Sequence, residues 1–105
     1  MTSDMNEITE LWDQFRNAPF PRELGGEEID GVELVLLDAD AAAVVSTFIG
    51  KSGKISEQQI QLLEGYVKDA SQVLPKLNGE GMHYFALLLK LCDLVLNQAK
   101  NLRPE

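Results

Sequence analysis

The chain has 105 residues, a formal net charge of −8 and 45% hydrophobic residues. This length predicts one domain, residues 1–105, because single domains usually run to roughly 100–200 residues. The negative charge argues against nucleic-acid binding, since phosphate backbones repel an acidic surface.

The first predicted helix covers residues 4–17. Asp4 and Glu7 have the spacing of a capping box, in which two side chains satisfy the first backbone amides of a helix. Apolar residues then recur at helical spacing, namely Ile8, Leu11, Trp12 and Phe15.

A loop that contains proline and glycine follows and should pack across one end of the fold. Pro19 and Pro21 flank Phe20 and prevent the helix from continuing. We expect Phe20 to pin this loop onto the core. Alternatively, the Pro-Phe-Pro triplet is an exposed recognition element, so Phe20 is a candidate functional residue.

Residues 31–49 are predicted to form a second helix. Asp30 and Glu33 fit another capping box, and Gly50 suits the position just past a helix end. The alternative is a short strand at 32–37, which would make the fold α+β. We favour the continuous helix because no other segment offers a convincing strand to pair with this one, and a lone strand leaves its backbone unsatisfied.

Asp38 is the unusual residue of this segment. A continuous helix places it among Val35, Ala42 and Val45, where a carboxylate must be paired, exposed at an interface or protonated. A Lys or Arg from another helix or subunit could pair with it. In the alternative with a strand, Asp38 or Asp40 simply caps a shorter helix. Both aspartates are candidate functional residues.

The third predicted helix, residues 57–78, has the clearest periodicity. Its apolar residues alternate steps of three and four: Ile60, Leu63, Val67, Ala70, Leu74 and Leu77. Ser56 and Gln59 again fit a capping box. Pro75 should kink or end the last turn.

The fourth predicted helix covers residues 81–101, and its segment 84–96 is apolar except for Lys90 and Asp93. A helix that is apolar around most of its circumference is either central or shared with a partner. We therefore predict an all-α, four-helix, roughly antiparallel bundle with this helix at its centre. The expected core residues are Leu11, Trp12, Phe15, Leu37, Val44, Phe48, Leu63, Val67, Leu74, Phe85, Leu88, Cys92 and Val95.

No catalytic, cofactor-binding or metal-binding pattern stands out. His83 is the only histidine, and Glu80 and Asp93 do not form a recognised metal-ligand spacing with it. We expect His83 to be solvated on a polar strip of the last helix. It remains a candidate because, with Asp38 or Tyr84 and residues of a second chain, it could serve a small enzyme or enzyme subunit.

The favoured functional hypothesis is a non-enzymatic protein-interaction module without cofactors, which binds itself as a homodimer or another protein through an apolar helical face. Residues 1–40 hold eleven acids against two bases, which favours a basic partner. A further alternative is an apolar-ligand carrier with a cavity between the second and fourth helices.

The expected compartment is the cytoplasm. Residues 1–10 contain three acids and no Lys or Arg, the reverse of a secretory signal. The lone Cys92 excludes an intramolecular disulfide and fits a reducing environment. The apolar segment 84–96 is too short for a bilayer, which takes about 20 residues, so we expect no membrane insertion.

Overall fold

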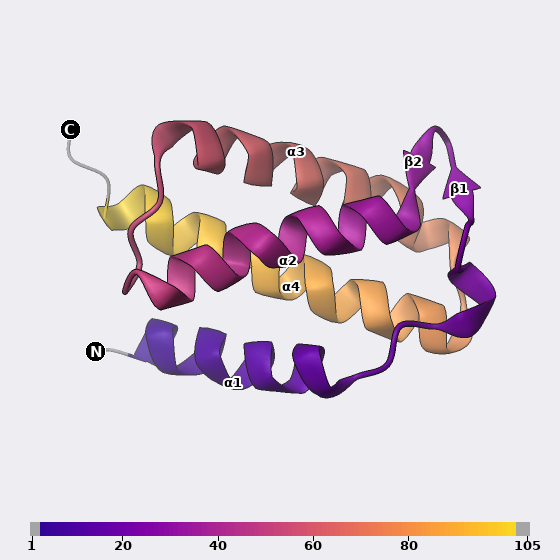
Figure 1. The fold of residues 1–105 in the computed structure, drawn as a ribbon, viewed down its shortest axis with the longest axis horizontal. Helices are drawn as coiled ribbons and strands as arrows, with labels where there is room; N and C mark the ends of the chain where they lie inside the picture. The colour runs from indigo at the N-terminus through magenta and orange to yellow at the C-terminus, as the bar shows by residue number, and fades with distance from the viewer. Residues whose placement is uncertain (1–2, 103–105) are drawn as a thin grey trace.

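A computed structural model describes residues 3–102 of the chain. Four α-helices account for most of it, joined by a small hairpin and two short 3-10 helices (Figure 1). In chain order the elements are α1 (Ser3–Asn17), η1 (Arg22–Leu24), β1 (Glu28–Ile29), β2 (Val32–Glu33), α2 (Leu34–Gly50), α3 (Glu57–Val73), η2 (Leu74–Lys76) and α4 (Gly79–Leu102). The predicted all-α, four-helix fold is therefore confirmed.

The helices run alternately up and down, so that α1 and α3 point opposite to α2 and α4 (Figure 1). α4 packs against all three of the others, which confirms its central position. Its polar strip, predicted from the sequence, is exposed: His83, Lys90, Asp93, Asn97 and Lys100. Within residues 3–102 no helix is both long and apolar enough to cross a membrane.

The second helix begins later than predicted. It starts at Leu34, and the predicted capping box is wrong because Glu33 makes no side-chain hydrogen bond at the helix start. Val32–Glu33 instead pairs in antiparallel register with Glu28–Ile29. The alternative of a strand at 32–37 is thus right for two residues only, and Asp38 lies inside a continuous helix.

An Asp-Gly turn explains this hairpin. Asp30 and Gly31 have φ values of 52° and 83°, both in the left-handed region. Two such residues form the tight turn that matches the twist of paired strands, and Asp-Gly is a preferred pair there. The assumption that no strand was available to pair with Val32 was wrong because this turn folds the chain back onto itself.

α3 begins where predicted, but its α-helix ends at Val73, five residues before the predicted end at residue 78. The Ser56 hydroxyl oxygen accepts a hydrogen bond from the Gln59 amide at 3.1 Å, and the Gln59 side-chain oxygen accepts one from the Ser56 amide at 3.0 Å. Pro75 lies in the 3-10 turn that ends the helix. α1 has its predicted extent, but the Asp4 side chain lies outside the described part of the chain, so its capping box is untested.

The core lies between α4 and the three other helices. Nine of the predicted core residues are buried: Phe15, Leu37, Val44, Phe48, Leu63, Phe85, Leu88, Cys92 and Val95. The other four pack at its margin and are partly buried: Leu11, Trp12, Val67 and Leu74. The bundle therefore covers α4 with its own chain.

Two glycines give opposite expectations for stability. Gly65 lies inside α3, and a Cβ there would meet nothing within 4 Å. Gly65→Ala should therefore raise the free energy of unfolding by about 0.5–1 kcal/mol, through helix propensity.

Gly31→Ala should lower the free energy of unfolding by about 1 kcal/mol, because φ is +83° at this hairpin position. Urea denaturation of both variants checks the signs, and a stabilising Gly31→Ala would contradict the hairpin.

Candidate functional site

Asp38 and Tyr84 form a polar contact between α2 and α4. Asp38 lies on the inner flank of α2, and the Tyr84 hydroxyl on α4 donates a hydrogen bond to its Oδ1 at 2.8 Å. Burial raises the pKa of the Asp38 carboxyl, and the hydrogen bond from Tyr84 offsets part of this. Burial and the neighbouring carboxylate raise the pKa of Tyr84, so its hydroxyl stays protonated and can donate. The partner of Asp38 is a tyrosine, not the Lys or Arg that we considered.

Other aromatic rings pack against Tyr84. The Tyr84 ring lies 5.0 Å from Phe15 of α1 and 5.4 Å from Phe20, measured between ring centroids. Phe20 also meets Phe85 edge to face at 6.0 Å. The predicted role of Phe20 is thereby confirmed, since its ring fixes the loop after α1 to the start of α4. Phe20 is partly buried there.

His83 lies beside this cluster but on the outside. It is exposed on α4 and lines a shallow cavity of about 270 Å³ between that helix and the loop at Ala18–Pro21. Glu80, Tyr84 and Leu87 complete the α4 side of this cavity, which is mostly apolar. Within residues 3–102 no group of three or more His, Cys, Asp or Glu residues could hold a metal ion.

Cys92 lies deep in the core. Burial, together with the nearby charges of Asp93 and Asp38, raises the pKa of its thiol to about 12. A thiol with such a pKa is almost entirely protonated at neutral pH and is a poor nucleophile. Cys92 is therefore a packing residue.

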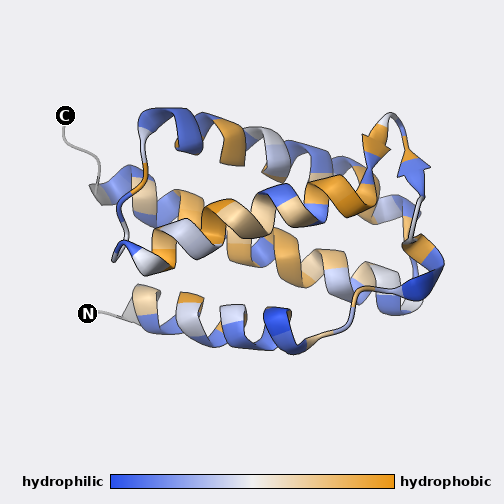
Figure 2. Ribbon diagram, in the orientation of Figure 1, coloured by the Kyte–Doolittle hydropathy of each residue, from blue (hydrophilic) through white to orange (hydrophobic). Residues whose placement is uncertain are grey.

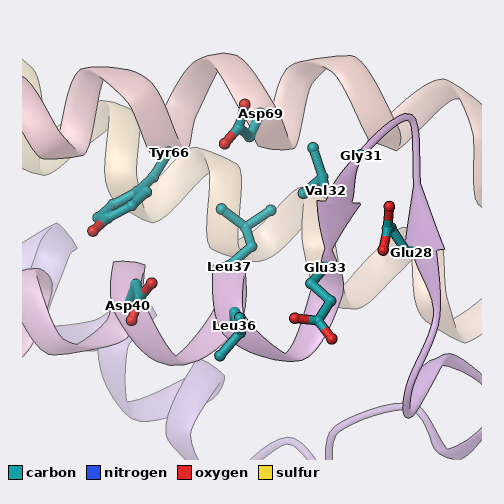
Figure 3. A pocket seen from close by; sticks show the side chains of 9 residues that line it. All are labelled: Glu28, Gly31, Val32, Glu33, Leu36, Leu37, Asp40, Tyr66 and Asp69. Atoms are coloured by element: carbon teal, nitrogen blue, oxygen red, sulfur yellow. The ribbon is translucent and has the colours of Figure 1, made fainter.

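A second, acidic cavity of about 290 Å³ lies between the hairpin, α2 and α3 (Figure 3). It is lined by Glu28, Gly31, Val32, Glu33, Leu36, Leu37, Asp40, Tyr66 and Asp69. Four of these side chains are carboxylates, and none of the lining residues is basic. The structure gives none of the four carboxylates an ion pair with another described residue.

The Tyr66 ring forms one wall of this acidic cavity. It extends from α3 toward Asp40 of α2 in Figure 3. Burial and the charge of Asp40 raise the pKa of the Tyr66 hydroxyl. Asp40 therefore lies inside α2 and does not cap it. It lines the acidic cavity, where it adds negative charge beside the Tyr66 ring.

The outward side of α2 differs from every other exposed helix side in the described chain. Figure 2 shows that α2 is largely hydrophobic along its length. Its outward residues are apolar or small, and together we call them the α2 face: Val35, Leu36, Ala39, Ala43, Ser46 and Gly50. Val35 is 45% exposed and Leu36 is 55% exposed. Asp40, at the edge toward α3, is the one charged residue on this side of α2.

The usual solvent face of a bundle helix is rich in charge, and α1 illustrates it. Glu7, Glu10, Asp13 and Arg16 are all exposed there. A surface helix normally shows one apolar stripe to the core and charged residues to water. α2 buries one apolar stripe and leaves Val35, Leu36 and several small residues in solvent on its outward side.

The structure brings three of the five predicted candidates into one cluster, namely Asp38, Tyr84 and Phe20. Tyr84 also lines the same cavity as His83, whereas Asp40 lines the acidic cavity. Sequence reasoning missed Glu28, Glu33, Tyr66 and Asp69 as neighbours of Asp40. A partial signal existed, because Tyr66 and Asp69 are three residues apart and share one side of α3.

Comparisons with protein-family models, curated proteins and solved structures found no match to this chain. Its function is therefore argued from its own surfaces.

Proposed function

We propose that this chain is a small, acidic, cytoplasmic and non-enzymatic protein-interaction module that binds itself or another protein through the α2 face. The observation that carries the proposal is the exposure of Val35 and Leu36 on a helix side that holds a single charged residue. Burying an apolar side chain on association is favourable by about 25 cal/mol for each Å² removed from water. Side chains exposed in this way contribute nothing to the packing of the bundle's own core.

The interior of the bundle supports a binding role more than a catalytic one. The Asp38 carboxylate already accepts the Tyr84 hydroxyl, and the aromatic rings of Phe15 and Phe20 lie against Tyr84. A general acid or base must reach a substrate proton within about 3 Å. The Asp38–Tyr84 pair instead joins α2 to α4, which fixes the position of the α2 face.

The test is site-specific photo-crosslinking in cells that produce the protein. A benzophenone side chain at Ala39, on the α2 face, should give a discrete covalent adduct with a protein. The same group at Ser71, which is exposed on α3, should give none. Excess wild-type protein should compete the adduct away, whereas the Leu36→Lys variant should not. Equal labelling from both positions, or no adduct from Ala39, would refute the proposed function.

A further inference from the structure

We propose that the α2 face, together with the acidic cavity beside it, docks a basic amphipathic helix of a protein partner. This inference rests on the proposed function and names the partner's chemistry. Leu36 joins the two parts, because it is 55% exposed on the α2 face and also lines the acidic cavity. A single ligand segment that covers Leu36 therefore meets both surfaces.

The apolar part of this surface fits a helix. Side chains at Ala39, Ala43, Ser46 and Gly50 are small or absent, so another helix can approach the α2 backbone closely, while Val35 and Leu36 provide apolar contact at one end. Helix-in-groove recognition uses apolar anchors spaced at three, four and seven residues. The α2 face repeats at that spacing, which an amphipathic helix would match.

α3 carries one further exposed apolar side chain. Leu62 is 45% exposed and lies one turn before Tyr66 on the same side of α3. An occupant that covers Tyr66 at the acidic cavity could therefore also contact Leu62.

The negative charge of the acidic cavity favours an occupant with a positive charge. The carboxylates of Glu28, Glu33, Asp40 and Asp69 surround it, and no described cation pairs with them. A Lys or Arg side chain could lay its methylenes on Leu36 and place its charge among the carboxylates and near the Tyr66 ring. Opposite charges across an interface also speed association and reject wrong partners.

A second copy of the chain fits this surface less well. Each copy carries a net charge of −8, so two of them repel before contact. Lys51 and Lys54 follow the carboxyl end of α2, whereas the acidic cavity lies at its amino end, so only an antiparallel pairing of two α2 faces would bring these lysines toward the cavity of the other copy. Self-association through the α2 face is accordingly a competing outcome of the test.

The test uses a helical probe peptide of leucine and lysine, amphipathic and 17 residues long to match α2, and a leucine-glutamate peptide of the same pattern. Fluorescence anisotropy measures the dissociation constants of both with the whole protein. We expect the lysine peptide to bind and the glutamate peptide not to bind. In nuclear magnetic resonance spectra, the shifted amides should lie on the α2 face and around the acidic cavity.

Matched variants locate the charge contribution. The triple variant Glu33→Gln, Asp40→Asn, Asp69→Asn should weaken binding of the lysine peptide by about tenfold, since three exposed ion pairs together contribute roughly that much. The control triple variant Glu7→Gln, Glu10→Gln, Asp13→Asn removes the same charge from α1 and should change binding by less than about twofold. Equal losses in the two triples would mean general attraction to an acidic protein and would overturn the inference.

A second matched pair locates the apolar contribution. Leu36→Ser should weaken binding of the lysine peptide several-fold, whereas Met82→Ser, which alters an apolar residue 38% exposed on α4, should leave it unchanged. Thermal melts verify that all variants fold.

Failure of this inference is separable from failure of the proposed function. A stable dimer in light scattering that is lost in Leu36→Lys would assign the α2 face to a second copy, which overturns the inference and leaves the proposed function standing. Absence of both peptide binding and an adduct at Ala39 would refute the two together.

Discussion

Phe85→Ala should lower the free energy of unfolding by about 3–5 kcal/mol, and Leu91→Ala should lower it by about 2–5 kcal/mol. Both side chains are 0% exposed on α4, and they lie roughly a third of a turn apart around that helix. Each truncation loses the transfer energy of the removed atoms and leaves a cavity. Large losses at both positions are expected because α1, α2 and α3 together cover α4.

Urea denaturation in a dilution series measures both losses. The control is Met82→Ala on the same helix, which should cost less than about 1 kcal/mol because its side chain is 38% exposed. Losses that depend on protein concentration would show that a second copy, rather than the chain itself, covers α4. A small loss at either Phe85 or Leu91 would contradict the central position of the helix.

Asp38→Asn should stabilise the protein at pH 7, and Tyr84→Phe should destabilise it by about 1–3 kcal/mol. Asparagine keeps an oxygen that accepts from the Tyr84 hydroxyl, and it removes a half-buried charge. Phenylalanine instead leaves the Asp38 carboxylate without its donor. Desolvation of the Asp38 charge therefore lowers the stability of the fold, and the hydrogen bond from Tyr84 offsets part of that loss.

The advantage of Asp38→Asn should depend on pH. Burial raises the pKa of Asp38 in the folded state above its ordinary value of 3.8, so the folded protein binds this proton more tightly than the unfolded chain does. The free energy of unfolding therefore falls as pH rises from 3.8 through the folded pKa, and the contribution of Asp38 levels off above it. The difference between Asp38→Asn and wild type should grow over the same range.

Urea denaturation at a series of pH values from about 4 to 7 tests this dependence, because the range begins near the pKa of a free aspartate. Asp13→Asn, at an exposed position on α1, controls for the loss of one negative charge. If Asp38→Asn proves as destabilising at pH 7 as Tyr84→Phe, the hydrogen bond to the charged carboxylate outweighs its desolvation. That result would reverse the expected sign.

Local signals in the sequence were sufficient for most helix boundaries. The capping pair Ser56 and Gln59 fixes the start of α3. Pro75 marks the region where the helix ends, although α3 ends at Val73 and the prediction extended it to residue 78. The Asp30–Gly31 turn is an equally local signal for the hairpin. Val32 then found a partner strand only four residues before the start of β2.

Local sequence signals could not predict which of the candidate residues would contact one another. Asp38 and Tyr84 are 46 residues apart in the chain, and a helical pattern predicts which side of a helix is buried without saying which neighbour it faces. Phe20 was expected on the core and is found there, but its contact with Tyr84 depends on how the loop crosses the end of α4. Asp40 was equally prominent in sequence and joins a different group.

The amino-acid sequence by itself determined that the chain is acidic, that four helices form, and that α4 needs cover on nearly every side, because composition and hydrophobic period are properties of the chain alone. Only the tertiary structure decided that α1, α2 and α3 provide this cover, and that the α2 face is left in solvent. It also decided that the hairpin, α2 and α3 bring four carboxylates together around Tyr66. The physical reason is that burial and charge clustering depend on which surfaces pack together, and packing joins residues that are distant in the chain.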